Sequence, residues 1–129
     1  IGTDWEIKFS NDFHIDVVPG KYSSSYNDYA YLFNKYTQSR LRTSITIHDE
    51  YVKKSKRQDI IRLLKLWKVR KKIPLKTFIL EQLIIKGCNG MKYNLLEPLI
   101  FTALHYINEN IMTIELRDPA NSSNIITDR

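Results

Sequence analysis

The sequence predicts an α+β fold, and two observations carry that prediction. Near the amino terminus, residues 5–9 and 13–18 alternate apolar and polar side chains, as strands with one solvent-facing side do. Farther along, apolar residues recur every three or four positions over three longer stretches, which is typical of amphipathic helices. With 129 residues, 43% of them hydrophobic, the chain has the size and composition of one globular domain.

The first predicted element is an antiparallel hairpin made of residues 5–9 and 13–18. Ser10, Asn11 and Asp12 between them have the chemistry of a turn. The apolar residues of the second strand share one face, so Asp16 points from the other. Two or three strands do not bury a core of their own. We therefore expect the hairpin to belong to a larger sheet that is not in this chain.

Residues 21–44 are polar and rich in tyrosine, and they predict a long loop with a short helix near residues 28–35. A turn or short helix is expected at residues 49–54. The three main helices are predicted at residues 58–71, 75–86 and 94–108. Ser55 is the predicted N-cap of the first, and Asn94 with Glu97 resembles a capping box at the start of the third. Residues 113–116 predict a short strand, followed by the polar tail DPANSSNIITD.

Charge and cysteine content restrict function only broadly. A net charge of +6 and a pI near 9.4 favour anionic partners, namely nucleotides, nucleic acid or a membrane surface. A solvated, lysine-rich surface explains the same balance equally well. The single cysteine, Cys88, excludes an intramolecular disulfide and fits a reducing compartment. Because no apolar run has membrane-spanning length and no signal-like segment is present, we expect a cytoplasmic protein without membrane contact.

Three features of the sequence are candidates for chemistry. Asp16 is a carboxylate on a rigid strand and could bind a metal or transfer a proton, although an exposed acid on a wet strand face is more common. Asp4 and Glu6 lie two residues apart and could share Mg²⁺, with the same ordinary alternative. A lysine of the basic segment KKSKRQDIIRLLKLWKVRKK could reach a polyphosphate, whereas surface lysines are the usual outcome. No zinc spacing and no glycine-rich phosphate loop is present.

Three stretches, FHIDVVPG, IIRLLKLWKVRKKIPLKTFILEQLI and DPANSSNIITD, resemble in this order the oligoadenylate synthetase/cyclic GMP-AMP synthase-like nucleotidyltransferases. The resemblance covers about residues 5–128. The bacterial branch of this family makes cyclic and linear oligonucleotide signals in anti-phage defence. The fold implied by the resemblance is the end of a polymerase-β-like sheet at residues 1–22, followed by a mostly helical domain at residues 23–129.

The resemblance also implies roles for particular residues. Asp16 matches the third of three catalytic carboxylates that hold two Mg²⁺ ions. Lys65 matches a lysine that steadies the triphosphate, while Lys68 is expected to be a surface lysine. Thr77 matches a small polar residue that bonds phosphate or base, and Phe78 matches an aromatic residue that stacks on the base. The family loop that matches DPANSSN lies beside the nucleotide, so its polar residues Asp118, Asn121 and Asn124 are expected to shape the pocket.

The sequence departs from the family at its beginning. The family's Gly-Ser motif and Asp-x-Asp pair are absent, and Asp4-x-Glu6 lies too near Asp16 to be that pair. Ile1 is also not an initiator methionine. We therefore expect the chain to be a cleaved or truncated C-terminal part, inactive alone. Its expected partners are nucleoside triphosphates and the missing N-terminal part, with nucleic acid less favoured.

Two other functions remain open at this point. One is a nucleotidyltransferase that modifies RNA or protein, which analysis of the product would distinguish. The other is a non-catalytic module that binds nucleotide or RNA, which a complete sequence without the upstream acids would favour.

Overall fold

The architecture is α+β, and the computed structural model describes residues 5–23, 28–91 and 95–127. Over these residues it contains four helices and three small antiparallel sheets. The strands are β1 (Trp5–Lys8), β2 (His14–Val17), β3 (Gly20–Tyr22), β4 (Ala30–Asn34), β5 (Ser39–Thr43), β6 (Arg117–Asp118) and β7 (Asn121–Ile125). The helices are α1 (Ile45–Ser55), α2 (Gln58–Arg70), α3 (Thr77–Gly87) and α4 (Leu96–Asn110).

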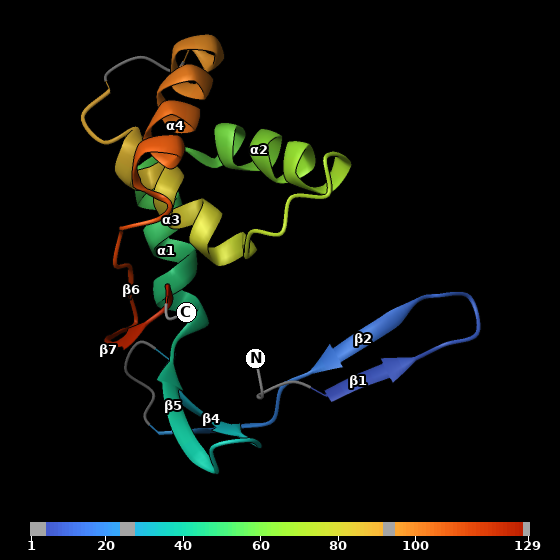
Figure 1. Ribbon diagram of the computed structural model, residues 1–129. Coiled ribbons are helices and arrows are strands. Elements are labelled where there is room, and N and C mark those ends of the chain that lie inside the picture. Colours follow the sequence, from blue (N-terminus) through green and yellow to red (C-terminus); the bar gives the residue numbers. More distant parts are fainter. Residues whose placement is uncertain (1–4, 24–27, 92–94, 128–129) are drawn as a thin grey trace.

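The predicted amino-terminal hairpin is confirmed. Strands β1 and β2 pair antiparallel with Glu6 directly opposite Asp16 and Trp5 opposite Val17. Every residue of both strands is exposed, the apolar ones included. The hairpin extends away from the helices (Figure 1) and makes a cation–π contact between Lys35 and the ring of Trp5. Its apolar side chains thus have little of the chain to pack against.

The prediction of a loop with a short helix over residues 21–44 is wrong. This segment forms the three-stranded sheet β3-β4-β5. Tyrosine, phenylalanine and threonine suit the pleated surface of a strand. The turn between β4 and β5 is closed by Asn34, whose side chain accepts hydrogen bonds from the amides of Tyr36 (3.0 Å) and Thr37 (3.2 Å). Such an Asx turn supports a hairpin from a polar sequence that looks like a loop.

The three main helices are confirmed, but their predicted caps are not. Ser55 ends α1, and its hydroxyl donates to the Val52 carbonyl (2.5 Å), while α2 begins after Arg57 without a side-chain cap. The short helix expected at residues 49–54 is longer, because Ser44 caps α1 by accepting a hydrogen bond from the Ile47 amide (3.2 Å). Asn94 lies outside the described residues.

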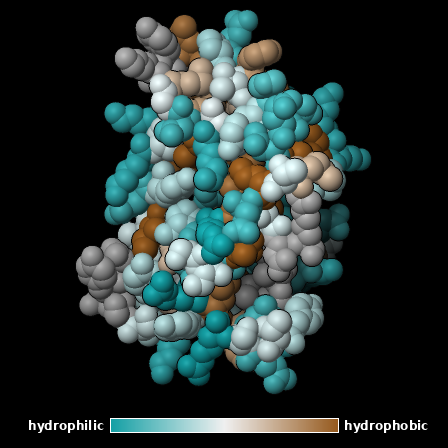
Figure 2. Space-filling view, turned by 60° about the vertical axis from the view of Figure 1, so that its left-hand side comes forward, coloured by the Kyte–Doolittle hydropathy of each residue, from teal (hydrophilic) through white to brown (hydrophobic). Residues whose placement is uncertain are grey.

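Helices α2, α3 and α4 enclose the core. Arg57 braces the turn after α3, because its guanidinium donates to the carbonyls of Cys88 (3.0 Å) and Met91 (2.7 Å). On the face shown in Figure 2, hydrophilic residues cover most of the surface and apolar residues appear in patches between them. The residues buried together in the core are Ile60, Ile61, Leu64, Leu80, Ile84, Cys88, Leu99 and Ala103.

The carboxyl-terminal segment also differs from its prediction. Residues 113–116 form no strand, and the polar tail is instead the β6–β7 hairpin, which packs beside β5. Leu116, just before the hairpin, and Ala120, in its turn, are buried. No helix among the described residues combines the length and apolar character needed to span a bilayer.

Candidate functional site

A cavity of about 670 Å³ lies where the sheet β3-β4-β5, helix α1, the start of α3 and strand β7 meet. Leu32 and Leu41, from β4 and β5, give it an apolar wall. The other residues that line it are Thr43, His48, Lys68, Lys76, Thr77, Phe78, Ile79, Asp118, Asn124, Ile125 and Ile126. Segments far apart in sequence thus contribute to one cavity.

One side of the cavity is positively charged. Lys68 on α2 donates from its ammonium to the hydroxyl of Thr77 (3.3 Å), the first residue of α3. Lys76 precedes Thr77 and also lines the cavity. No side chain caps the amides of the first turn of α3. Two lysines and the positive end of a helix dipole favour an anion at this point.

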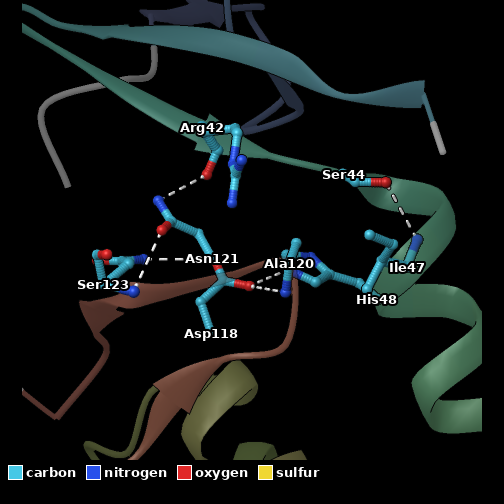
Figure 3. Close-up of polar contacts among 9 residues, drawn as sticks. Arg42, Ser44, Ile47, His48, Asp118, Ala120, Asn121 and Ser123 are labelled. Carbon is cyan, nitrogen blue, oxygen red and sulfur yellow. Dashed lines mark hydrogen bonds and ion pairs between the residues drawn. The ribbon is translucent and has the colours of Figure 1, made fainter. Parts of the chain in front are cut away.

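A buried carboxylate orders another part of the cavity lining. Asp118 is 5% exposed and accepts hydrogen bonds from the imidazole of His48 (2.6 Å) and the amide of Ala120 (2.8 Å), as Figure 3 shows. The side chain of Asn124 donates to its second oxygen (3.3 Å). Burial alone would raise the pKa of Asp118, but these hydrogen bonds together hold that pKa below its ordinary value.

Phe78 joins the two sides of the cavity. Its half-buried ring packs on the imidazole of His48, with ring centroids 4.8 Å apart and planes inclined by 43°. Because Asp118 fixes His48, it indirectly fixes this aromatic surface as well. The cavity therefore pairs an aromatic and aliphatic wall with a cationic rim, which suits a ligand with a flat ring and an anionic group.

The structure brings together Thr77, Phe78, Asp118 and Asn124 among the residues singled out in the sequence. Asn121 lies beside the cavity, where its side chain donates to the Arg42 carbonyl (3.2 Å). Lys65 does not line the cavity: its ammonium forms an ion pair with the carboxylate of Glu81, which ties α2 to α3. Lys68, expected on the open surface, takes the place by Thr77 instead.

Asp16 lies apart from this cavity, on the exposed hairpin (Figure 1). Glu6 projects from the same side of the hairpin because the two residues are directly paired, and it also pairs with Lys8 (3.4 Å). Asp4 lies outside the described residues. Among the described residues, no three metal-ligating side chains lie together. These residues do not fit a two-magnesium site by themselves.

His48, Lys68 and Lys76 were missed as site residues by sequence reasoning. His48 and its partner Asp118 are separated by 70 residues, so no local pattern links them. Lys68 lies one helical turn after Lys65, and spacing alone does not separate the two. The one usable signal was the start of α3, where a helix begins directly after Lys76 in a basic segment.

The chain matches no protein-family model, and no curated protein or solved structure matches it either.

Proposed function

We propose that the chain is the C-terminal part of a Mg²⁺-dependent nucleotidyltransferase that makes cyclic or linear oligonucleotide signals, and that its cavity binds a nucleoside triphosphate. One observation carries the proposal. Thr77 and Phe78, which the resemblance assigns to the nucleotide, line the same cavity as two lysines and Asn124.

The lining fits the two ends of a nucleotide. Phe78 and the aliphatic wall would hold the base, since a ring face stacks on a base without requiring hydrogen bonds. Lys68, Lys76 and the first amides of α3 would hold the phosphates, because charge-assisted hydrogen bonds are strongest where water is partly excluded. The volume of about 670 Å³ lies within the range of small-molecule sites.

Catalysis requires more than the described residues provide. Magnesium would align the attacking hydroxyl with the phosphate when bound. Asp16 would be one of its ligands, and further carboxylates would have to come from outside the described residues. We therefore expect the purified chain, incubated with Mg²⁺ and labelled nucleoside triphosphates, to form no product. Turnover by this chain would contradict the assignment of Asp16 as one ligand of an incomplete set.

The two lysines of α2 give a sharp test of the binding site. The resemblance assigns the phosphate to Lys65, but the Glu81 carboxylate already neutralises that ammonium, whereas Lys68 faces the cavity. We expect Lys68→Met to raise the dissociation constant for ATP by about ten- to a hundredfold. Lys65→Met removes the same charge one turn away and should change it by less than about twofold. Isothermal titration calorimetry measures both.

The aromatic wall is tested separately. Phe78→Leu keeps an apolar side chain and removes the ring, so we expect ATP binding to weaken by about three- to tenfold. Titrations with GTP, CTP and UTP show whether the base matters. The proposal fails if the unaltered chain binds none of the four nucleotides. A loss in Lys65→Met and not in Lys68→Met would move the phosphate site to Lys65.

A further inference from the structure

The sheet β3-β4-β5 has two faces of different character. Successive residues of a strand point to opposite sides, and directly paired residues point to the same side. Leu32, Leu41 and Thr43 turn toward the cavity described above. The alternate residues therefore form a second, outward face. Tyr31 is paired there with both Lys21 and Arg42, and Phe33 with Arg40.

The outward face is exposed, aromatic and basic. Phe33 is 45% exposed and Tyr31 38%. Together with Lys21 and Arg40 they line a shallow hollow of about 520 Å³, and none of the residues that line it is acidic. Beside the hollow, the guanidinium of Arg42 lies over the ring of Tyr29, 4.8 Å from its centroid. Exposed aromatic rings with cations beside them suit a partner that has both flat rings and negative charge.

We infer that this outward face binds single-stranded nucleic acid. Proteins that bind single strands without sequence preference combine aromatic side chains, on which bases stack, with cations that track the backbone. Tyr31 and Phe33 are the stacking surfaces, about 6.6 Å apart along β4. Lys21 and Arg40 flank them and contact the phosphates. A duplex is disfavoured because its base faces are already covered by neighbouring bases.

The charge distribution supports this partner over a general attraction to anions. The lysines of α1 differ, because acids of the same helix pair with them: Lys53 with Asp49 (2.5 Å) and Lys54 with Glu50 (3.4 Å). That helix carries a similar density of lysine but has its charge partly neutralised. The site on the sheet lies on the opposite face from the proposed nucleotide cavity, so it does not depend on the proposed function.

The test is fluorescence anisotropy of the purified chain with a labelled oligouridine of about 12 nucleotides, with oligothymidine and a duplex of equal length as parallel probes. We expect both single strands to bind and the duplex to bind at least about tenfold more weakly. Phe33→Ser and Tyr31→Ser should each weaken binding by about five- to a hundredfold. Phe33→Leu keeps an apolar side chain, and its binding should fall as well, so loss of the ring is separated from loss of folding.

A charge-matched pair of double variants tests the phosphate contacts. Lys21→Gln with Arg40→Gln should lower the slope of log affinity against log salt by about 1.4, because each phosphate contact on a single strand contributes about 0.7. Lys53→Gln with Lys54→Gln removes the same charge from α1 and should leave the slope nearly unchanged. The inference is overturned if the chain does not bind single strands, if the duplex binds equally well, if Phe33→Leu binds like the unaltered chain, or if the two double variants lose affinity equally.

Discussion

The helices α2–α4 and the β1–β2 hairpin are both rich in apolar residues, but they use them differently. In the helices, Leu80 and Ile84 are fully buried. In the hairpin, Ile7 is 50% exposed and Phe13 57%. The sequence pattern is equally regular in both regions. The difference shows that periodicity identifies an element, whereas its stability depends on what covers it.

This contrast indicates that most of the free energy of folding comes from the apolar residues buried between the helices. A hairpin on its own is marginally stable in water, because it buries too little apolar surface to offset the ordering of its backbone. The exposed apolar residues of the hairpin therefore contribute little to the stability of the chain.

The largest expected effect comes from truncating a buried residue of the helices and, for comparison, an exposed residue of the hairpin. Leu80→Ala removes a fully buried side chain between the helices and should lower the free energy of unfolding by about 2–5 kcal/mol. Ile15→Ala makes a similar change on the hairpin and should cost less than about 0.5 kcal/mol. Urea unfolding of both variants measures this. A comparable loss in Ile15→Ala would mean that the hairpin is buried in solution.

A second prediction concerns how closely the helices approach. A Cβ atom at Gly87 would lie 2.7 Å from the Cβ of Tyr106 on α4, so this position of α3 has no room for a methyl group. Gly87→Ala should therefore lower stability by about 1–3 kcal/mol, although alanine is the better helix former. Lys86→Ala, on the exposed side of the same turn, is the control and should stay within about 0.5 kcal/mol. Stabilisation by Gly87→Ala would show that the two helices are farther apart.

The smallest expected effect concerns the carboxyl-terminal hairpin. The β6–β7 hairpin is held by Asp118, whose folded-state pKa lies below its ordinary value. A depressed pKa stabilises the folded state above the unfolded value near 4, and this contribution is lost as pH falls through the folded pKa. Lowering the pH from 6 to 3 should therefore reduce the melting temperature of the unaltered chain more than that of Asp118→Asn. Thermal unfolding at each pH measures this. Parallel pH curves for the two proteins would contradict this.

The regular part of the fold could be predicted from the sequence. The β1–β2 hairpin and helices α2–α4 follow local periodicity, which one stretch of chain contains in full. The sheet β3-β4-β5 could not be predicted from the sequence. Its polar and tyrosine-rich residues, such as those around Asn34, resemble a loop until their pairing partners are known. The β6–β7 hairpin was not predicted for the same reason, because its polar sequence resembles a loop until its strands are paired with each other and placed beside β5.

The candidate site divides in the same way. Thr77 and Phe78 were found from a motif at a helix start, because that signal is local. The choice between Lys65 and Lys68 depends on where Glu81 and Thr77 lie on the facing helix, and that information is tertiary. His48 contacts Asp118 and Phe78, which are both distant from it in sequence, so no pattern within α1 could have identified it as a site residue.

Side chains of β5 point alternately to the cavity and to the outward face of the sheet, so one strand contributes to both surfaces. Leu41 and Thr43 line the cavity, while Arg40 and Arg42 stand on the outer face. A single inserted residue in the turn between β4 and β5 would shift the register by one and exchange these sets, placing guanidinium groups against the aliphatic wall. A change in the number of residues between β4 and β5 would therefore disturb both surfaces at once, whereas a substitution in the five-residue strand β5 alters one of them. Insertions or deletions in this turn should therefore be more damaging than single substitutions in β5.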